Sequence, residues 1–108
     1  MSEKEELLYG LKVWLIKPSI YLSNYSLNEL LDDELVLDAI SFCIYMIDEL
    51  VTNLVKKYPE IKEEHKNIDF SFLMNIKNEC FKDDLINTNK IYDLSKNILK
   101  EMGNKLIF

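Results

Sequence analysis

Arginine is absent from this 108-residue chain, and all 13 of its basic residues are lysines. Glycine and proline occur only twice each, and such a scarcity of helix breakers favours long helices over many short strands. With 19 acidic residues the net charge is −6, and an acidic field opposes tight, sequence-independent binding to phosphate backbones. The composition therefore predicts a helical protein that is not a general nucleic-acid binder.

Cysteine and histidine are also scarce. Cys43 and Cys80 lie among apolar residues, which predicts two free, packed thiols in a reducing compartment rather than a disulfide. The single histidine, His65, lies in a charged segment, where we expect it in a solvated loop. No Cys/His cluster has zinc-ligand spacing, so the sequence predicts neither a metal site nor a cofactor.

Long hydrophobic runs are missing as well. The most apolar stretch, residues 39–47, is shorter than the ~20 residues that a membrane-spanning helix needs. The acidic N-terminus is not followed by the hydrophobic region of a signal peptide. We therefore predict a cytoplasmic protein without membrane association, folded as a single domain over residues 1–108.

The first third of the chain has the spacing of two helices. Apolar residues recur every three to four positions over residues 2–22, where Pro18 predicts a kink or a break because its ring removes a backbone N–H. Ser26 and Glu29 then have capping-box spacing, which predicts a short helix over residues 27–31.

The strongest helical pattern covers residues 33–57, with Asp32 or Asp33 as its cap and Pro59 after its end. Apolar residues occupy so much of its circumference that we expect it at the centre of the bundle, or facing a partner chain as well as the core. The predicted inner face comprises Leu35, Ala39, Phe42, Cys43, Met46, Leu50, Leu54 and Tyr58, widened by Ile40, Ile47 and Val51.

The residue pattern after Pro59 predicts a charged connection over residues 60–67, then a fourth helix and a last helix. The fourth begins at Asn67 or Asp69, carries Phe70, Leu73, Ile76, Lys77 and Cys80 and ends at a polar turn, Asp83-Asp84. The last is capped by Thr88, turns Ile91, Leu94, Ile98, Leu99 and Met102 inward and ends at a C-cap, Gly103. Together these segments predict an all-α, four- to five-helix up-and-down bundle around the long helix 33–57.

Four segments between residues 25 and 92 together resemble the motifs of one known protein family. Residues 26–31 read Ser-Leu-Asn-Glu-Leu-Leu and lead through an acidic joint to the pair Asp38-Ala39. Residues 47–51 are similar to the family's Ile-Gly-Glu-Ala segment, and residues 58–61 match its Tyr-Pro-Glu-Ile. Residues 69–78 resemble its Pro-Trp-x-x-Ile-x-Gly-x-Arg-Asn. In this order the four segments resemble the HepT-like toxin family of the HEPN fold, and the resemblance implies a HEPN-like helical bundle.

Members of this family are homodimeric, metal-independent RNases that form toxin–antitoxin modules with a small nucleotidyltransferase (MNT) antitoxin. Their R-x-x-x-x-H-x-Y motif falls here on Lys77, Lys82 and Asp84, so none of its three functional identities is kept. Lys77 lacks the planar fork that grips phosphate, and Lys82 is a poor general acid or base near neutral pH. Asp84 cannot accept AMP from the antitoxin as the family's tyrosine does.

We therefore predict a catalytically degenerate HepT-like protein without catalytic residues, which acts as a dimerising, partner-binding module for a nucleotidyltransferase-domain protein. Two alternatives stay open. The first is an active endoribonuclease in which Lys77 and Lys82 replace Arg and His, since lysine can stabilise a phosphorane by charge. The second is a four-helix protein of the bacteriocin-immunity type.

Overall fold

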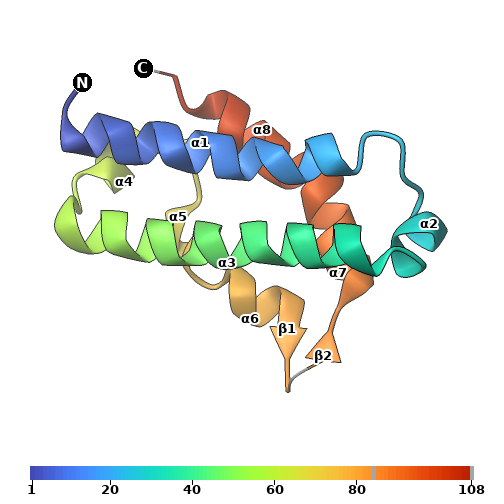
Figure 1. Ribbon diagram of the computed structural model, residues 1–108. Helices are drawn as coiled ribbons and strands as arrows, with labels where there is room; N and C mark the ends of the chain where they lie inside the picture. The colour runs from blue at the N-terminus through green and yellow to red at the C-terminus, as the bar shows by residue number, and fades with distance from the viewer. Residues whose placement is uncertain (84, 108) are drawn as a thin grey trace.

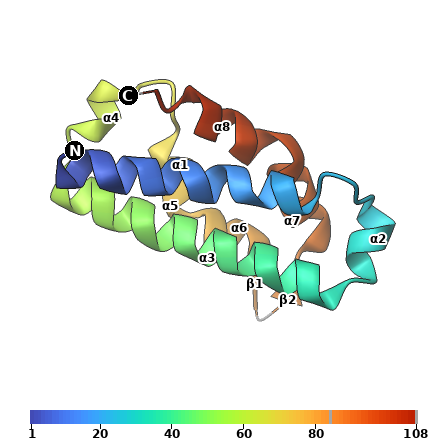
Figure 2. The same ribbon diagram turned by 45° about the horizontal axis from the view of Figure 1, so that its top comes forward.

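Two long helices, α1 (Glu3–Tyr21) and α3 (Glu34–Lys57), lie side by side and antiparallel in the computed structural model, which describes residues 1–83 and 85–107 (Figures 1 and 2). The short helix α2 (Leu27–Leu31) joins them at one end of the bundle. The last helix, α8 (Leu99–Lys105), packs on the other side of α1 from α3. The all-α bundle with a long helix at its centre is confirmed.

Five short helical elements and a hairpin complete the chain between α3 and α8. They are α4 (Ile61–Glu64), α5 (Phe70–Met74), α6 (Ile76–Cys80), strands β1 (Phe81–Lys82) and β2 (Leu85–Ile86), α7 (Thr88–Asp93) and a π-helical segment (Leu94–Ile98). The two strands pair antiparallel, Phe81 with Ile86 and Lys82 with Leu85, and project below α3 in Figure 1.

The predicted caps of the first half are confirmed. Ser26 and Glu29 form a reciprocal capping box at α2, and the Asp33 carboxylate accepts the Val36 N–H at the start of α3. A break at Pro18 does not occur, because α1 continues to Tyr21 and buries the proline ring. Only one turn follows Pro18, so few backbone hydrogen bonds depend on the segment beyond it.

The inner face of α3 differs from the prediction. Its buried residues are Ile40, Cys43, Ile44, Ile47, Val51 and Leu54, whereas Leu35 and Phe42 of the predicted face are exposed. Both stripes are apolar, and periodicity alone does not say which of them the rest of the chain covers. The residues expected only to widen the face are all buried, whereas only Cys43 and Leu54 of the eight residues in the expected centre are.

The charged connection 60–67 contains a helical turn, α4, because Ile61 is buried against the core. The predicted fourth helix is divided at Asn75 into α5 and α6. Asp69 caps α5 as one of the two expected caps, its carboxylate accepting the Phe72 N–H. After α6 the chain forms the hairpin, which the sequence analysis missed, and Asp83 takes a left-handed conformation with φ 53° at its turn.

Three predictions for the last helix are wrong. Asn87 rather than Thr88 is its cap, since the Asn87 side-chain oxygen accepts the Lys90 N–H. The π-helical segment inserts a residue into the turn, which rotates Ile98 towards solvent while Leu99 stays buried. Gly103 lies inside α8 and has no positive φ, so it is not a left-handed C-cap.

Two hydrogen bonds attach the connection between α1 and α3 to α7. The Tyr92 hydroxyl donates to the backbone oxygen of Tyr25 (3.0 Å), and the Tyr25 hydroxyl donates to the Asp33 carboxylate (2.5 Å). The Tyr25 hydrogen bond, followed by that from the Val36 backbone N–H, lowers the pKa of the Asp33 carboxyl. The start of α3 is therefore stabilised by an ionised carboxylate.

We expect this contribution to depend on pH. Because the pKa of Asp33 is lower in the folded state, its stabilisation is complete above the unfolded pKa of about 3.9 and is lost as the pH falls through the folded value. In urea unfolding, the free energy of unfolding of the Asp33→Ala variant should be lower than that of the unmodified protein. The difference should be largest at pH 6 and smallest at pH 2–3. A difference that stays constant over this range would contradict the assignment. Tyr25→Phe, which removes the largest cause, should flatten the dependence.

Candidate functional site

Lys77 lies on α6, exposed to solvent, beside the outer face of α3. Its backbone N–H donates to the Asp48 carboxylate of α3 (3.2 Å), which places the start of α6 against that helix. Its ammonium lies 5.4 Å from the centroid of the Tyr45 ring. Lys77 thus occupies an aromatic and acidic environment, where it makes a cation–π contact.

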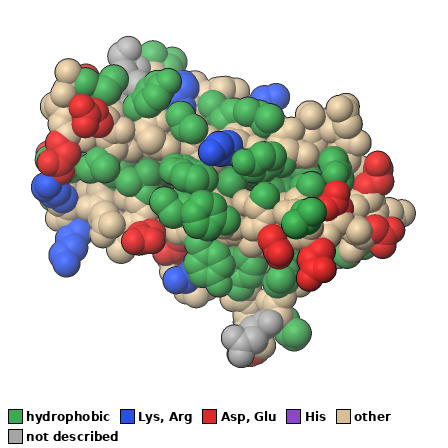
Figure 3. Space-filling view, viewed as in Figure 1, with side chains coloured by type: hydrophobic (Ala, Val, Ile, Leu, Met, Phe, Trp, Pro, Cys, Tyr) green, Lys and Arg blue, Asp and Glu red, His purple; other side chains and the backbone are tan. Residues whose placement is uncertain are grey.

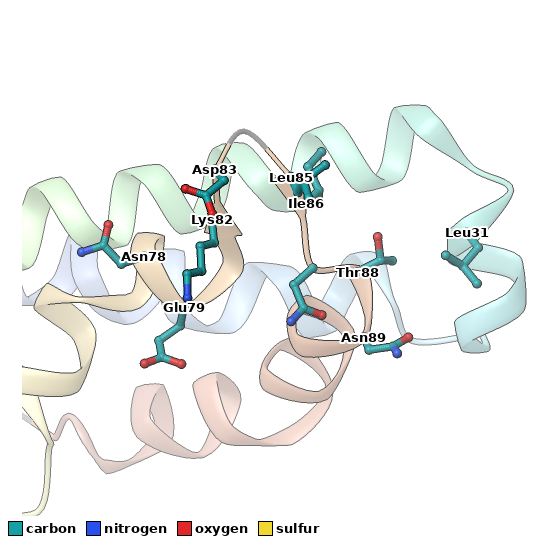
Figure 4. Close-up of a pocket in the computed structure, with 10 residues that line it drawn as sticks. Leu31, Asn78, Glu79, Lys82, Asp83, Leu85, Ile86, Thr88 and Asn89 are labelled. Carbon is teal, nitrogen blue, oxygen red and sulfur yellow. The ribbon is translucent and has the colours of Figure 1, made fainter.

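Lys82 extends from β1 into a hollow of about 730 Å³ between the hairpin and α7 (Figure 4). In that view Lys82 and Glu79 share one wall of the hollow, while Thr88 and Asn89 form the opposite side. The lining is Leu31, Asn78, Glu79, Lys82, Asp83, Leu85, Ile86, Asn87, Thr88 and Asn89. The hollow is therefore a mixed polar and apolar surface with one lysine and two carboxylates.

The two motif lysines line adjoining hollows. Lys77 lines a hollow of about 500 Å³ that shares Asn78, Asp83 and Ile86 with the hollow of Lys82, and neither of these two hollows is lined by both lysines. The third motif position, Asp84, lies outside the described residues. His65 ends α4, at the end of the bundle away from the hairpin. The sole histidine therefore cannot complete a catalytic group with Lys77 or Lys82 within one chain.

Carboxylates outnumber ammonium groups around both lysines. Asp38 and Asp83 line the hollow of Lys77, and Glu79 and Asp83 line that of Lys82. Glu79 also forms an ion pair with Lys90 (3.5 Å). A phosphate group entering the hollow of Lys77 would meet net negative charge, whereas beside Lys82 the ion pair with Lys90 offsets the charge of Glu79, so the arrangement at Lys77 is unfavourable for a scissile phosphodiester.

The two cysteines are free and buried, as expected. Burial raises the pKa of both thiols, that of Cys80 to about 12. A thiol of this kind is protonated at neutral pH and is not a nucleophile. Among the described residues, no three Cys, His, Asp or Glu side chains are grouped to hold a metal ion. None of the described helices is both long and apolar enough to cross a membrane.

Comparison with protein-family models, with curated proteins and with solved structures finds no match for this chain. The resemblance to the HepT-like family remains a prediction from the four sequence segments. The geometry of the described residues is therefore the main guide to function.

A row of aromatic rings across α1, α3 and β1 was not predicted from the sequence. Trp14 of α1 meets Phe42 of α3 edge to face, with centroids 5.7 Å apart. One turn further along α3, Tyr45 stacks on Phe81 of β1 at 5.0 Å. The only sequence signal of this row was the i, i+3 spacing of Phe42 and Tyr45; Phe42 was assigned to the predicted inner face of the helix, and Tyr45 was assigned to no face.

Exposed apolar residues of α1 extend this row. Tyr9, Val13 and Ile20 lie on the outward side of α1, opposite the buried Leu11 and Leu15. Figure 3 shows the result as a broad band of hydrophobic side chains over α1 and α3. We refer to Tyr9, Val13, Trp14, Ile20 and Phe42 as the apolar face. Soluble monomers rarely expose large contiguous apolar patches unless these bind something.

Proposed function

We propose that this chain is a non-catalytic HEPN-like module that acts by protein binding: it forms a homodimer and engages a nucleotidyltransferase-domain protein. The observation that carries the proposal is the apolar face. It combines aromatic and aliphatic side chains over two adjacent long helices, which is the composition of the core of a subunit interface. The family resemblance supports a second copy as the molecule that covers it.

The surroundings of the motif lysines support the absence of catalysis. RNA cleavage at the 2'-hydroxyl needs one group to accept a proton and another to stabilise the negative phosphorane. Lys77 and Lys82 line different, adjoining hollows, and each is accompanied by carboxylates that repel the phosphate. No feature of the described surface favours the immunity-type alternative.

The dimer is tested by a charge placed on the apolar face. Val13→Glu should convert a dimer into a monomer in sedimentation-velocity experiments at micromolar concentration, because a buried, unpaired carboxylate costs several kcal/mol. Ile98→Glu is the matched control, since Ile98 is 41% exposed against 39% for Val13 but belongs to the π-helical segment and not to α1 or α3. The control should remain dimeric.

Circular dichroism of both variants distinguishes dissociation from unfolding. If the unmodified protein is monomeric at these concentrations, the dimer part of the proposal fails. If both variants dissociate equally, the interface lies elsewhere. The nucleotidyltransferase part is tested by co-expression with a nucleotidyltransferase encoded beside this gene, and it fails if the two chains do not co-purify.

A further inference from the structure

A second surface lies beyond the exposed Phe42 and Tyr45 of α3, on the side of that helix that faces α6 and the hairpin. Two hollows of about 500 and 290 Å³ follow one another along α3 and share Tyr45 and Lys77. They form one continuous trough, which on α3 runs from Asp38 to Asn53, a distance of about 22 Å at the rise of an α-helix. We call this surface the α3 trough.

The middle of the trough is apolar. Tyr45 stacks on Phe81 there, and the half-exposed side chain of Ile86 lies on the hairpin side. These three side chains come from α3, β1 and β2, so the surface exists only when the hairpin is folded against α3. A rigid aromatic pair beside an aliphatic side chain is a suitable receptor for the apolar side chains of a partner helix.

Both ends of the trough are acidic. Asp38 and Asp83 line one end, and Asp48 and Glu49 line the other. Lys77 is the only cation lining either hollow, and its ammonium lies over the Tyr45 ring. With four carboxylates and one ammonium, the trough is more negative than an average part of the surface of this chain, whose net charge is −6.

The negative charge of the α3 trough excludes a second copy of this chain as its binding partner. If two copies were paired trough to trough, the net negative charge of one trough would face the net negative charge of the other. If the α3 helices of two copies were paired antiparallel, with the centre of the pairing between Phe42 and Tyr45, Asp38 of one copy would also lie opposite Glu49 of the other. Like charges opposed across an interface are strongly unfavourable, so the trough requires a partner of opposite charge.

We propose that the α3 trough binds a basic amphipathic helix of another protein. The inference rests on the proposed partner-binding function and assigns it a surface and a partner chemistry. Asp38 and Glu49 are eleven residues apart on α3, which corresponds to about 16 Å, or three helical turns. The partner helix presents apolar side chains at i, i+4 and i+7 to Tyr45, Phe81 and Ile86, with Lys or Arg about three turns apart on either side.

The probe is an 18-residue fluorescein-labelled helical peptide with three leucines at this spacing and flanking arginines. Two comparison peptides keep its length: one is a scrambled sequence of the same composition, and the other replaces each arginine by glutamate. Fluorescence anisotropy with the full-length protein should show saturable binding of the amphipathic basic peptide and at least about tenfold weaker binding of both others.

Two double variants test the location, each removing two negative charges. Asp38→Asn with Glu49→Gln changes the trough, whereas Asp93→Asn with Glu101→Gln changes exposed residues of α7 and α8. We expect the first to weaken binding about tenfold and the second by less than about twofold at 0.15 M salt. Equal weakening by both, equal binding of the scrambled peptide, or no binding of the basic peptide would each overturn the proposal.

The result of the peptide-binding experiment can be distinguished from the result of the dimer experiment that tests the proposed function. Val13→Glu lies on α1 outside the trough, so it should leave peptide binding unchanged while it removes the dimer. A protein that dimerises but does not bind the basic peptide contradicts the trough assignment alone. A monomeric protein that binds it retains the trough and loses the dimer.

Discussion

Ile47→Ala is expected to lower the free energy of unfolding by about 2–5 kcal/mol, whereas Phe42→Ala should lower it by about 1 kcal/mol or less. Ile47 is fully buried in the core, so its truncation removes buried apolar surface and leaves a cavity. Phe42 is 57% exposed and loses mainly its edge contact with Trp14. Urea unfolding monitored by circular dichroism measures both variants.

This pair decides which face of α3 is inside, because periodicity alone assigned both residues to one broad apolar face. Phe42 is the larger side chain and would cost about 3–5 kcal/mol if it were buried. Equal costs, or a larger cost for Phe42, would therefore contradict the orientation of α3. The measurement should be made well below any dimerisation constant, since interface burial would add to the cost of Phe42→Ala.

Gly103→Ala and Gly10→Ala should change stability in opposite directions although both glycines lie in helices. A methyl group at Gly103 would lie 2.7 Å from Ile16 Cγ1 and 3.3 Å from Leu15 Cβ. We expect an overpacking cost of about 1–3 kcal/mol, only partly offset by the higher helix propensity of alanine. At Gly10 the nearest atom is Leu50 Cδ2 at 3.8 Å, so the same substitution should stabilise by about 1 kcal/mol.

A double variant tests the cause. Ile16→Ala removes the atom nearest to the new methyl group, so Gly103→Ala should become neutral or stabilising in that background. If Gly103→Ala destabilises by the same amount with and without Ile16, the close approach of α1 and α8 is not the reason. If both glycine substitutions stabilise, the approach of the two helices is looser than the structure shows.

Local sequence signals predicted the first half of the fold well. The boundaries of α2 and the cap of α3 depend on Ser26, Glu29 and Asp33, whose side chains bond to backbone groups three residues away. The later elements depend on tertiary contacts. The division at Asn75, the π-helical segment and the interior glycine of α8 allow short helices to pack around α1 and α3, and residue spacing does not record these contacts.

The candidate sites were predictable only in part. The motif positions Lys77 and Lys82 could be located from the sequence, but the adjoining hollows that they line could not, because these depend on a hairpin with only two residues in each strand. Trp14 and Phe42 are distant in sequence, as are Tyr45 and Phe81, so their pairing needs the assembled bundle. The i, i+4, i+7 and i+11 spacing of Asp38, Phe42, Tyr45 and Glu49 was the one local sign of an exposed functional stripe.

The central claim, that this chain binds proteins and does not cut RNA, is tested most directly by an RNA cleavage assay in EDTA. Purified protein and its Lys77→Ala and Lys82→Ala variants are incubated with a mixed pool of structured and single-stranded RNA, and the products are resolved by denaturing electrophoresis. We predict no cleavage above buffer for any of the three. Cleavage by the unmodified protein that both substitutions abolish would contradict the account and establish the lysine-based endoribonuclease.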